Sequence, residues 1–561
     1  MKSKKKSTLM TDVIGILCGV FLVAVGVVSA VSTASAHVAG MRDSQIPDSA
    51  LTMIGTAEGR NGVIKVQVKG DEGQIYQIKV LSEDETKGIG SVAVKEVPRA
   101  ICANQDLQVD GATGATITSD GIKAAVYDAL TQNGIDAYHF GYRIVKADKV
   151  AKRAETGAKS VVAVTPEQWK AEHPKVYSAY WKDEYPDIYA SFLQNEQNKD
   201  VIEYTEEFPQ IVSLYAGYPF SYDYASARGH AYVIDDVTGT DRLHKKMEDG
   251  SLNPEIFQKA NCFTCKSPVM AALVNETGGE AYSWTFEQMQ AFADEPVGCY
   301  TCHGDTPGEF TVTHTYLADA VGDDFERIDA ANLACGQCHN EYYFAPDTKA
   351  TTIAHHDLAS MAPETMLAYF NDGSNFPTGE PFADWTNPRT GVKQIKVQHP
   401  EFETFLGAGS PHADTFTCAD CHMPDAVNAN GEAYHSHNLI SPLDNPELIA
   451  NTCSQCHYDL VSEVRGVQEK IETRTYTVGY RLEYLTELLA KAVADGQYTD
   501  EQLDPVRSLA RDAQFYWDFV FVENAEGAHN PALTNQCLDK ADELCGQATD
   551  MILKLTRQQA A

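Results

Sequence analysis

The stretch Cys262-Phe263-Thr264-Cys265-Lys266 has the form Cys-x-x-Cys followed by a nitrogen ligand, the pattern that attaches a c-type haem. In such a motif both thiols form thioethers to the porphyrin, and the next side chain ligates the iron. Four copies ending in histidine follow, at residues 299–303, 335–339, 418–422 and 453–457. Five motifs in one chain predict five c-type haems and disfavour zinc knuckles or redox dithiols. The haem-attachment cysteines are Cys262, Cys265, Cys299, Cys302, Cys335, Cys338, Cys418, Cys421, Cys453 and Cys456.

The first motif ends in Lys266 instead of histidine. An ammonium group must lose its proton before it can bind iron, so a lysine ligand is costly and indicates a special role. We interpret this haem as the active site, with one face open for substrate, and the other four as electron carriers with histidine on both faces. The alternative is a drifted motif that carries an inert haem.

The 561-residue chain has 44 basic and 79 acidic side chains, a net charge of −35. Such a surface repels nucleic acid, so we expect no nucleic-acid partner. It also repels anions at long range, and an anionic substrate would need a local cationic pocket. The length indicates more than one domain.

The N-terminus has the features of an export signal. Lys2, Lys4, Lys5 and Lys6 precede an uncharged run from Val13 to Val31, and Ala34-Ser35-Ala36 follows. The run is longer than a usual signal core and close to the roughly 20 residues that span a bilayer. Residues 1–36 are therefore expected to be a membrane anchor, or else a cleaved signal peptide. In both cases the remainder is extracytoplasmic.

Residues 48–147 are expected to form a small α+β domain, because strand-like alternation at 63–68 and 75–80 precedes a helical pattern at 122–130. The stretch from Asp110 to Ser119 is rich in small residues and hydroxyls. It is compatible with a phosphate site, or equally with a tight turn capped by Ser119. Residues 148–163 have the composition of a linker, and 164–561 would form the second domain.

Asp110-Gly-Ala-Thr-Gly-Ala-Thr116 resembles the FMN-binding domain of ion-translocating quinone and ferredoxin oxidoreductases. This resemblance implies FMN covalently esterified to Thr116, with Asp110 marking the site for a flavin transferase. In the upstream segment Glu85-Thr-Lys-Gly-Ile-Gly90, Lys87 stands where the family has a proline. Cys102 has no partner motif and is interpreted as structural.

From about residue 165 onward the chain resembles the ammonia-forming pentahaem cytochrome c nitrite reductases. The resemblance rests on the lysine motif together with four segments: Gly217-Tyr-Pro-Phe220, Arg228-Gly-His230, residues 335–344 and Gln398-His399-Pro400. It implies a mainly α multihaem cytochrome c domain with long C-terminal helices and a homodimer interface. Apolar residues at helical spacing, such as Leu482, Leu485 and Leu489, agree with long helices. Cys537 and Cys545 are too far apart on one helix to bridge.

The resemblance implies that nitrite binds at the lysine haem beside three further catalytic residues, Arg242, Tyr342 and His399. Arg228 is the alternative to Arg242, whose flanking sequence departs from the family. A Ca²⁺ site is implied at Glu341, Tyr342, Lys396 and Gln398, whose oxygen donors suit a hard cation.

The axial ligands implied on the motif side are Lys266, His303, His339, His422 and His457. Those implied on the opposite faces are His230, His412, His437 and His529. The remaining histidines, at 244, 314, 355, 356 and 435, are interpreted as ordinary polar residues.

The sequence thus predicts an exported flavin–pentahaem reductase that delivers six electrons to nitrite and forms ammonium. Its electrons would come from a membrane quinol-linked or flavin-linked donor. Hydroxylamine, nitric oxide or sulfite are alternative substrates. The other class of function left open is a multihaem conduit that only transfers electrons.

Overall fold

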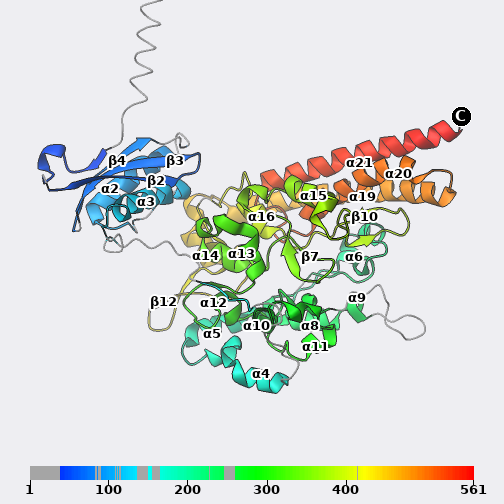
Figure 1. Cartoon of the computed structure of the whole chain (residues 1–561), viewed down its shortest axis with the longest axis horizontal. Coiled ribbons are helices and arrows are strands. Elements are labelled where there is room, and N and C mark those ends of the chain that lie inside the picture. The colour runs from blue at the N-terminus through cyan, green and yellow to red at the C-terminus, as the bar shows by residue number, and fades with distance from the viewer. Residues whose placement is uncertain are drawn as a thin grey trace, which may run out of the picture. The chain divides into compact units, whose positions relative to one another are not determined.

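The computed structural model describes most of the chain from Val38 onward (Figure 1). It describes residues 38–560 except for 48, 72, 83–84, 86–89, 108, 110, 113–114, 136–139, 141–148, 155–164, 227, 245–258 and 414. The predicted anchor or signal at 1–36 lies outside this part, as do Asp110 and Lys87. Within the described residues, no helix has both the length and the apolar character of a membrane span. The chain divides into two compact units, Met1–Ile144 and Val145–Ala561.

The first unit is a small α+β fold, as predicted. Its antiparallel sheet has the order β1-β4-β3-β2, and alternate residues such as Ile64, Val66 and Val68 are buried. Two helices, α2 and α3, supply the other half of its core, in which Val94 and Ile122 are buried. The elements are β1 (Val38–Gly40), β2 (Leu51–Glu58), β3 (Val63–Gly70), β4 (Ile75–Ser82), α2 (Gly90–Asn104) and α3 (Thr116–Thr131).

The second unit is mostly helical, also as predicted, and its strands are short. The helices before residue 460 are α4 (Pro166–Glu172), α5 (Pro186–Phe192), α6 (Tyr204–Glu207), α7 (Ile211–Leu214), α8 (Val233–Gly239), α9 (Asp241–His244), α10 (Pro268–Glu276), α11 (Phe286–Gln290), α12 (Cys299–His303), α13 (Thr315–Val321), α14 (Ala330–Gly336), α15 (Pro363–Asn371), α16 (Glu401–Leu406), α17 (Cys418–His422) and α18 (Pro446–Asn451). The strands are β5 (Lys149–Val150), β6 (Thr311–Val312), β7 (Tyr342–Phe344), β8 (Thr351–Ile353), β9 (Trp385–Thr386), β10 (Lys393–Gln394), β11 (Asp425–Val427) and β12 (Ala433–His435).

Three long helices end the chain and lie side by side in Figure 1: α19 (Leu460–Asp495), α20 (Asp500–Phe521) and α21 (Pro531–Ala560). The Asp459 side chain caps α19 by accepting from the Ser462 amide. Gly496 ends that helix in the left-handed conformation, with φ 63°. Leu482, Leu485 and Leu489 are buried at helical spacing. The predicted long C-terminal helices are therefore present, and Cys537 and Cys545 are both buried and unbridged on α21.

Residues 149–154 belong structurally to the second unit, although they fall in the predicted linker. Strand β5 pairs in parallel with β6, and the Ala154 amide donates to the Asn275 carbonyl at 2.7 Å. This pairing uses backbone groups, so no apolar pattern in the sequence predicts it. Residues 155–164, the rest of the predicted linker, lie outside the described residues.

Candidate active site and haem ligands

Helical turns position the attachment cysteines. Residues 299–303 form α12 and residues 418–422 form α17, while the lysine motif begins in the 3₁₀ helix Ala260–Phe263. A helical turn brings residues three and four apart onto one side, so both cysteines and the following ligand face the same space. Within the described residues none of the ten motif cysteines forms a disulfide, which leaves their sulfurs available for haem attachment.

The eight histidines predicted as axial ligands lie in four pairs, each joining a motif histidine to one of the other set. An imidazole nitrogen lies about 2 Å from a metal that it ligates, so two rings on opposite faces of one iron have centroids roughly 6 Å apart. The structure gives 6.0 Å for His230–His339, 6.2 Å for His303–His437, 6.0 Å for His412–His457 and 6.3 Å for His422–His529. The spacing fits an iron in each pair, and ligation itself stays a prediction.

Several of these imidazoles are oriented through Nδ1. Backbone carbonyls lie 2.9 to 3.0 Å from Nδ1 of His303, His422 and His437. For two further ligands the neighbour of Nδ1 is a carboxylate at 2.7 Å: Glu463 for His457 and Glu523 for His529. An Nδ1–H that donates to such an acceptor leaves Nε2 free to ligate.

The Lys266 segment has different neighbours. Burial raises the pKa of the Cys262 thiol, while the charges of Lys266 and Arg242 act in the opposite direction. Burial also raises the pKa of Tyr342 far above its usual range, and Cys265 and Cys262 add to the effect. On haem attachment the sulfurs become thioethers and lose the ionisable proton.

His399 is the third predicted catalytic neighbour. The pKa of the Cys265 thiol is lowered to about 6, first by hydrogen bonding to Cys338, with smaller contributions from Lys266 and His399. Arg242, Tyr342 and His399 thus each interact electrostatically with a cysteine of the lysine motif, and their catalytic roles stay predictions.

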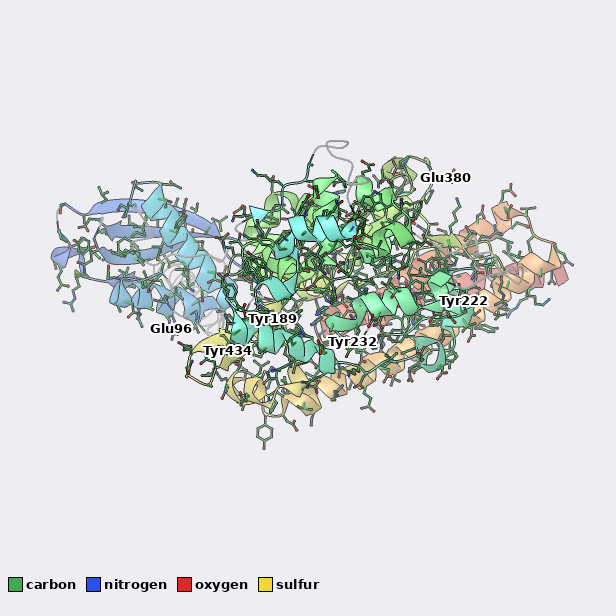
Figure 2. The ribbon with its side chains drawn as sticks, turned by 90° about the horizontal axis from the view of Figure 1, so that it is seen from below. Glu96, Tyr189, Tyr222, Tyr232, Glu380 and Tyr434 are labelled. Carbon is green, nitrogen blue, oxygen red and sulfur yellow. The ribbon has the colours of Figure 1, made fainter. Side chains whose placement is uncertain are left out.

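Arg242 and its alternative, Arg228, have different surroundings. The guanidinium of Arg242 lies over the Phe220 ring at 4.8 Å, and the Tyr222 hydroxyl donates to its carbonyl at 3.5 Å. Arg228 instead pairs with Asp236 at 2.6 Å and lies over the Tyr232 ring. Tyr222 and Tyr232 lie at separate positions in Figure 2. Arg242 thus acts electrostatically on the lysine motif, while Arg228 is neutralised by a carboxylate.

The four residues predicted to bind calcium are neighbours. The Gln398 amide donates to Glu341 Oε2 at 2.6 Å, and its side chain donates to the Lys396 carbonyl at 3.0 Å. Glu341 is fully buried, and in the part of the chain that the structure describes its Oε1 has no hydrogen-bond partner. Burial raises the pKa of Glu341 well above its usual range, so a cation there would relieve the cost of ionising it. A carboxylate, an amide and carbonyls suit Ca²⁺. In the described part of the chain, no cluster of three or more His, Cys, Asp or Glu could hold a metal.

The sequence interpretation missed a supporting pair behind Glu341. His355 Nε2 lies 3.0 Å from Glu403 Oε1, with both side chains fully buried. The other oxygen of Glu403 accepts from the Glu341 amide at 3.0 Å. Glu403 lies four residues after His399, so a search for acids near that histidine could have indicated it. Of the other remaining histidines, His314 is buried, His435 is exposed, and the His244 side chain lies outside the described residues.

In the first unit, the predicted flavin stretch leads into α3, which begins at Thr116. Ser119 lies within the first turn instead of at the N-cap, and its hydroxyl accepts from the Ala112 amide at 3.0 Å. The Thr118 hydroxyl donates to the buried carboxylate of Glu85. The side chain of Thr116 lies outside the described residues, so its attachment to FMN stays a prediction. Cys102 is unpaired, and burial raises its pKa to about 11.

Five attachment motifs and four histidine pairs in a mainly helical unit are the features of a multihaem c-type cytochrome. Residues 165–561 match the family model of cytochrome c552, and residues 59–131 match that of the FMN-binding domain. The chain therefore belongs to the cytochrome c552 family and carries an FMN-binding domain before it.

Among solved structures, the chain is similar to the cytochrome c nitrite reductase of Desulfovibrio desulfuricans ATCC 27774, a catalytic subunit described with two calcium sites. The identity is 28% and the TM-score 0.60, over 68% of this chain and 86% of that one. The resemblance expected from the motifs is thus confirmed. An undecahaem cytochrome from the S-layer of Carboxydothermus ferrireducens matches at 18% identity, over 57% of this chain and 40% of that one, with a TM-score of 0.27. The outer cell wall cytochrome OcwA matches at 16% identity, over 86% and 85%, with a TM-score of 0.30.

Proposed function

We propose that this protein is an exported cytochrome c nitrite reductase that adds six electrons to nitrite and releases ammonium. One observation carries the proposal. Four motif histidines each face a second histidine, whereas the cysteines of the Lys266 motif interact electrostatically with Arg242, Tyr342 and His399. An electron conduit needs only the first arrangement.

Each of these residues has a separate task. When bound, the lysine-ligated haem supplies an iron that accepts a small ligand and electrons. Arg242 provides fixed positive charge, which an anion needs in a chain of net charge −35. His399 donates protons to the nitrite oxygens as they leave as water. Tyr342 donates a further hydrogen bond.

Calcium would stabilise the geometry of this site. Glu341, Lys396, Gln398 and the Tyr342 carbonyl would hold the ion, and Tyr342 and His399 belong to the same two segments. The buried, unpartnered oxygen of Glu341 supports the proposal.

Electrons would enter through FMN on Thr116, attached by a flavin transferase, or through the outer haems, from a membrane quinol-linked donor. Residues 1–36 would anchor the protein outside the cytoplasm. A homodimer could form through α19, where Tyr480 and Tyr484, one helical turn apart, are 49% and 54% exposed.

The deciding experiment is anaerobic turnover with reduced viologen and nitrite, with ammonium quantified. Stoichiometric ammonium is expected. If hydroxylamine or sulfite oxidises the viologen and nitrite does not, that compound would replace nitrite as the proposed substrate. If none of the three is reduced, an electron-transfer conduit would be favoured.

A further inference from the structure

The carboxylate of Glu401 lies between two imidazoles that have different predicted roles. Its Oε2 is 3.8 Å from Nδ1 of His339, a predicted haem ligand, and its Oε1 is 3.9 Å from Nδ1 of the catalytic His399. The ring centroids of the two histidines are 6.1 Å apart. The Asn524 amide donates to Glu401 Oε1 at 3.1 Å and fixes the carboxylate from the side of the C-terminal helices.

Two atoms of this group are buried and unsatisfied. Among the described residues, Glu401 Oε2 and His399 Nδ1 have no hydrogen-bond partner, although both are inaccessible to solvent. A buried polar atom without a partner is energetically costly, which favours closing the gap. A small rotation of the side chains would bring each Nδ1 within hydrogen-bond distance of the carboxylate.

We propose that Glu401 is a positioning residue that accepts Nδ1–H from both His339 and His399, and so links the active-site proton donor to a ligand of the neighbouring haem. This inference rests on the proposed function of His399. With Nδ1 held by the carboxylate, Nε2 of His399 is left free for the proton transfer proposed above. The same carboxylate increases electron donation from His339 and lowers the reduction potential of its iron.

Two other carboxylates provide a comparison. Glu463 faces His457 and Glu523 faces His529, and each of these is a predicted haem ligand. Of these three carboxylates, Glu401 is the one that also faces His399. Glu523→Gln is therefore a matched control, because it removes a buried carboxylate from a haem ligand without touching the catalytic histidine.

The first test is a double-mutant cycle between Glu401→Gln and His399→Asn in the haem-loaded protein. We expect Glu401→Gln to lower kcat for nitrite about tenfold or more, with little change in KM. In the His399→Asn background the same substitution should have a clearly smaller effect, no larger than that of Glu523→Gln, because only its contact with His339 remains. An equal loss in both backgrounds would overturn the proposal. Glu523→Gln should lower kcat by the same factor whether His399 is present or replaced by Asn.

The second test measures haem potentials by spectroelectrochemistry. Glu401→Gln should raise the potential of the haem ligated by His230 and His339, and Glu523→Gln that of the haem ligated by His422 and His529. An unchanged potential in Glu401→Gln would refute the contact to His339. If the parent protein does not reduce nitrite, the proposed function fails. The double-mutant cycle can then be repeated with cyanide affinity of the open haem, and additive effects there would refute the contact to His399.

Discussion

The ring centroids of His303 and His437 lie 6.2 Å apart, although one ends a haem motif in α12 and the other follows β12. Their Nδ1 atoms are turned toward backbone carbonyls, which leaves Nε2 of each ring for a metal. The pair thus has both the spacing and the ring orientation that one iron needs.

The first prediction follows from this pair. His437→Ala should leave all haems attached, because the cysteines are unchanged, but convert one haem from six-coordinate low spin to high spin. Pyridine haemochrome and intact mass would count five haems, and EPR would report the spin state. A parent-like EPR spectrum would show that His437 is not a ligand.

Lys266→His should keep the haem attached and lower nitrite reduction, because imidazole changes electron donation to the iron opposite the substrate. We expect a loss of at least about tenfold in kcat. Viologen-driven turnover gives the rate, and haem content provides the control. Full activity would show that lysine ligation is incidental.

Arg242→Leu should weaken nitrite turnover, whereas Arg228→Leu should not. The first removes the positive charge beside the lysine motif, while the second removes a charge already paired with Asp236. Loss of one charge-assisted contact corresponds to roughly tenfold or more in kcat/KM. Equal losses in the two variants would contradict the assignment of Arg242.

Calcium removal should lower activity by loosening the segments of Tyr342 and His399. Chelation is expected to reduce kcat about tenfold, with recovery on adding Ca²⁺. Glu341→Gln should weaken calcium binding, because it removes the one charged donor of the predicted set. Active protein that contains no calcium by metal analysis would end this proposal.

Thr116→Ala should abolish covalent flavin while leaving haem content and viologen-driven nitrite reduction unchanged. Flavin fluorescence in a denaturing gel reports attachment. Quinol-driven reduction should collapse in the same variant, because FMN accepts two electrons and releases them singly to the haems. Parent-like quinol activity would show that electrons enter elsewhere.

Much of this architecture could be predicted from sequence because its signals are local. The attachment motifs fit within five residues, the strands at 63–68 and 75–80 alternate, and the C-terminal helices repeat apolar residues. The opposite-face histidines had no local signal and came from family resemblance. Their pairing needed the structure, because His230 faces His339 and His529 faces His422 across long stretches of chain.

The supporting carboxylates were not predicted at all. Glu401 and Glu403 follow His399 closely, yet nothing in the spacing says that Glu401 turns toward His339 or that Glu403 pairs with His355. Such contacts depend on the packing of separate segments. The backbone pairing of β5 with β6 could not be predicted from the sequence for the same reason.

The four histidine pairs also bear on how the chain stays folded. Once iron occupies them, each pair is a reversible cross-link, and the one between His303 and His437 closes a loop on the order of a hundred residues. By analogy with a disulfide, closing such a loop lowers the entropy of the unfolded chain and stabilises the native state by about 4 to 5 kcal/mol. The region between residues 165 and 459, built from short helices and two-stranded pairings, would then owe its stability as much to its metals as to its apolar core.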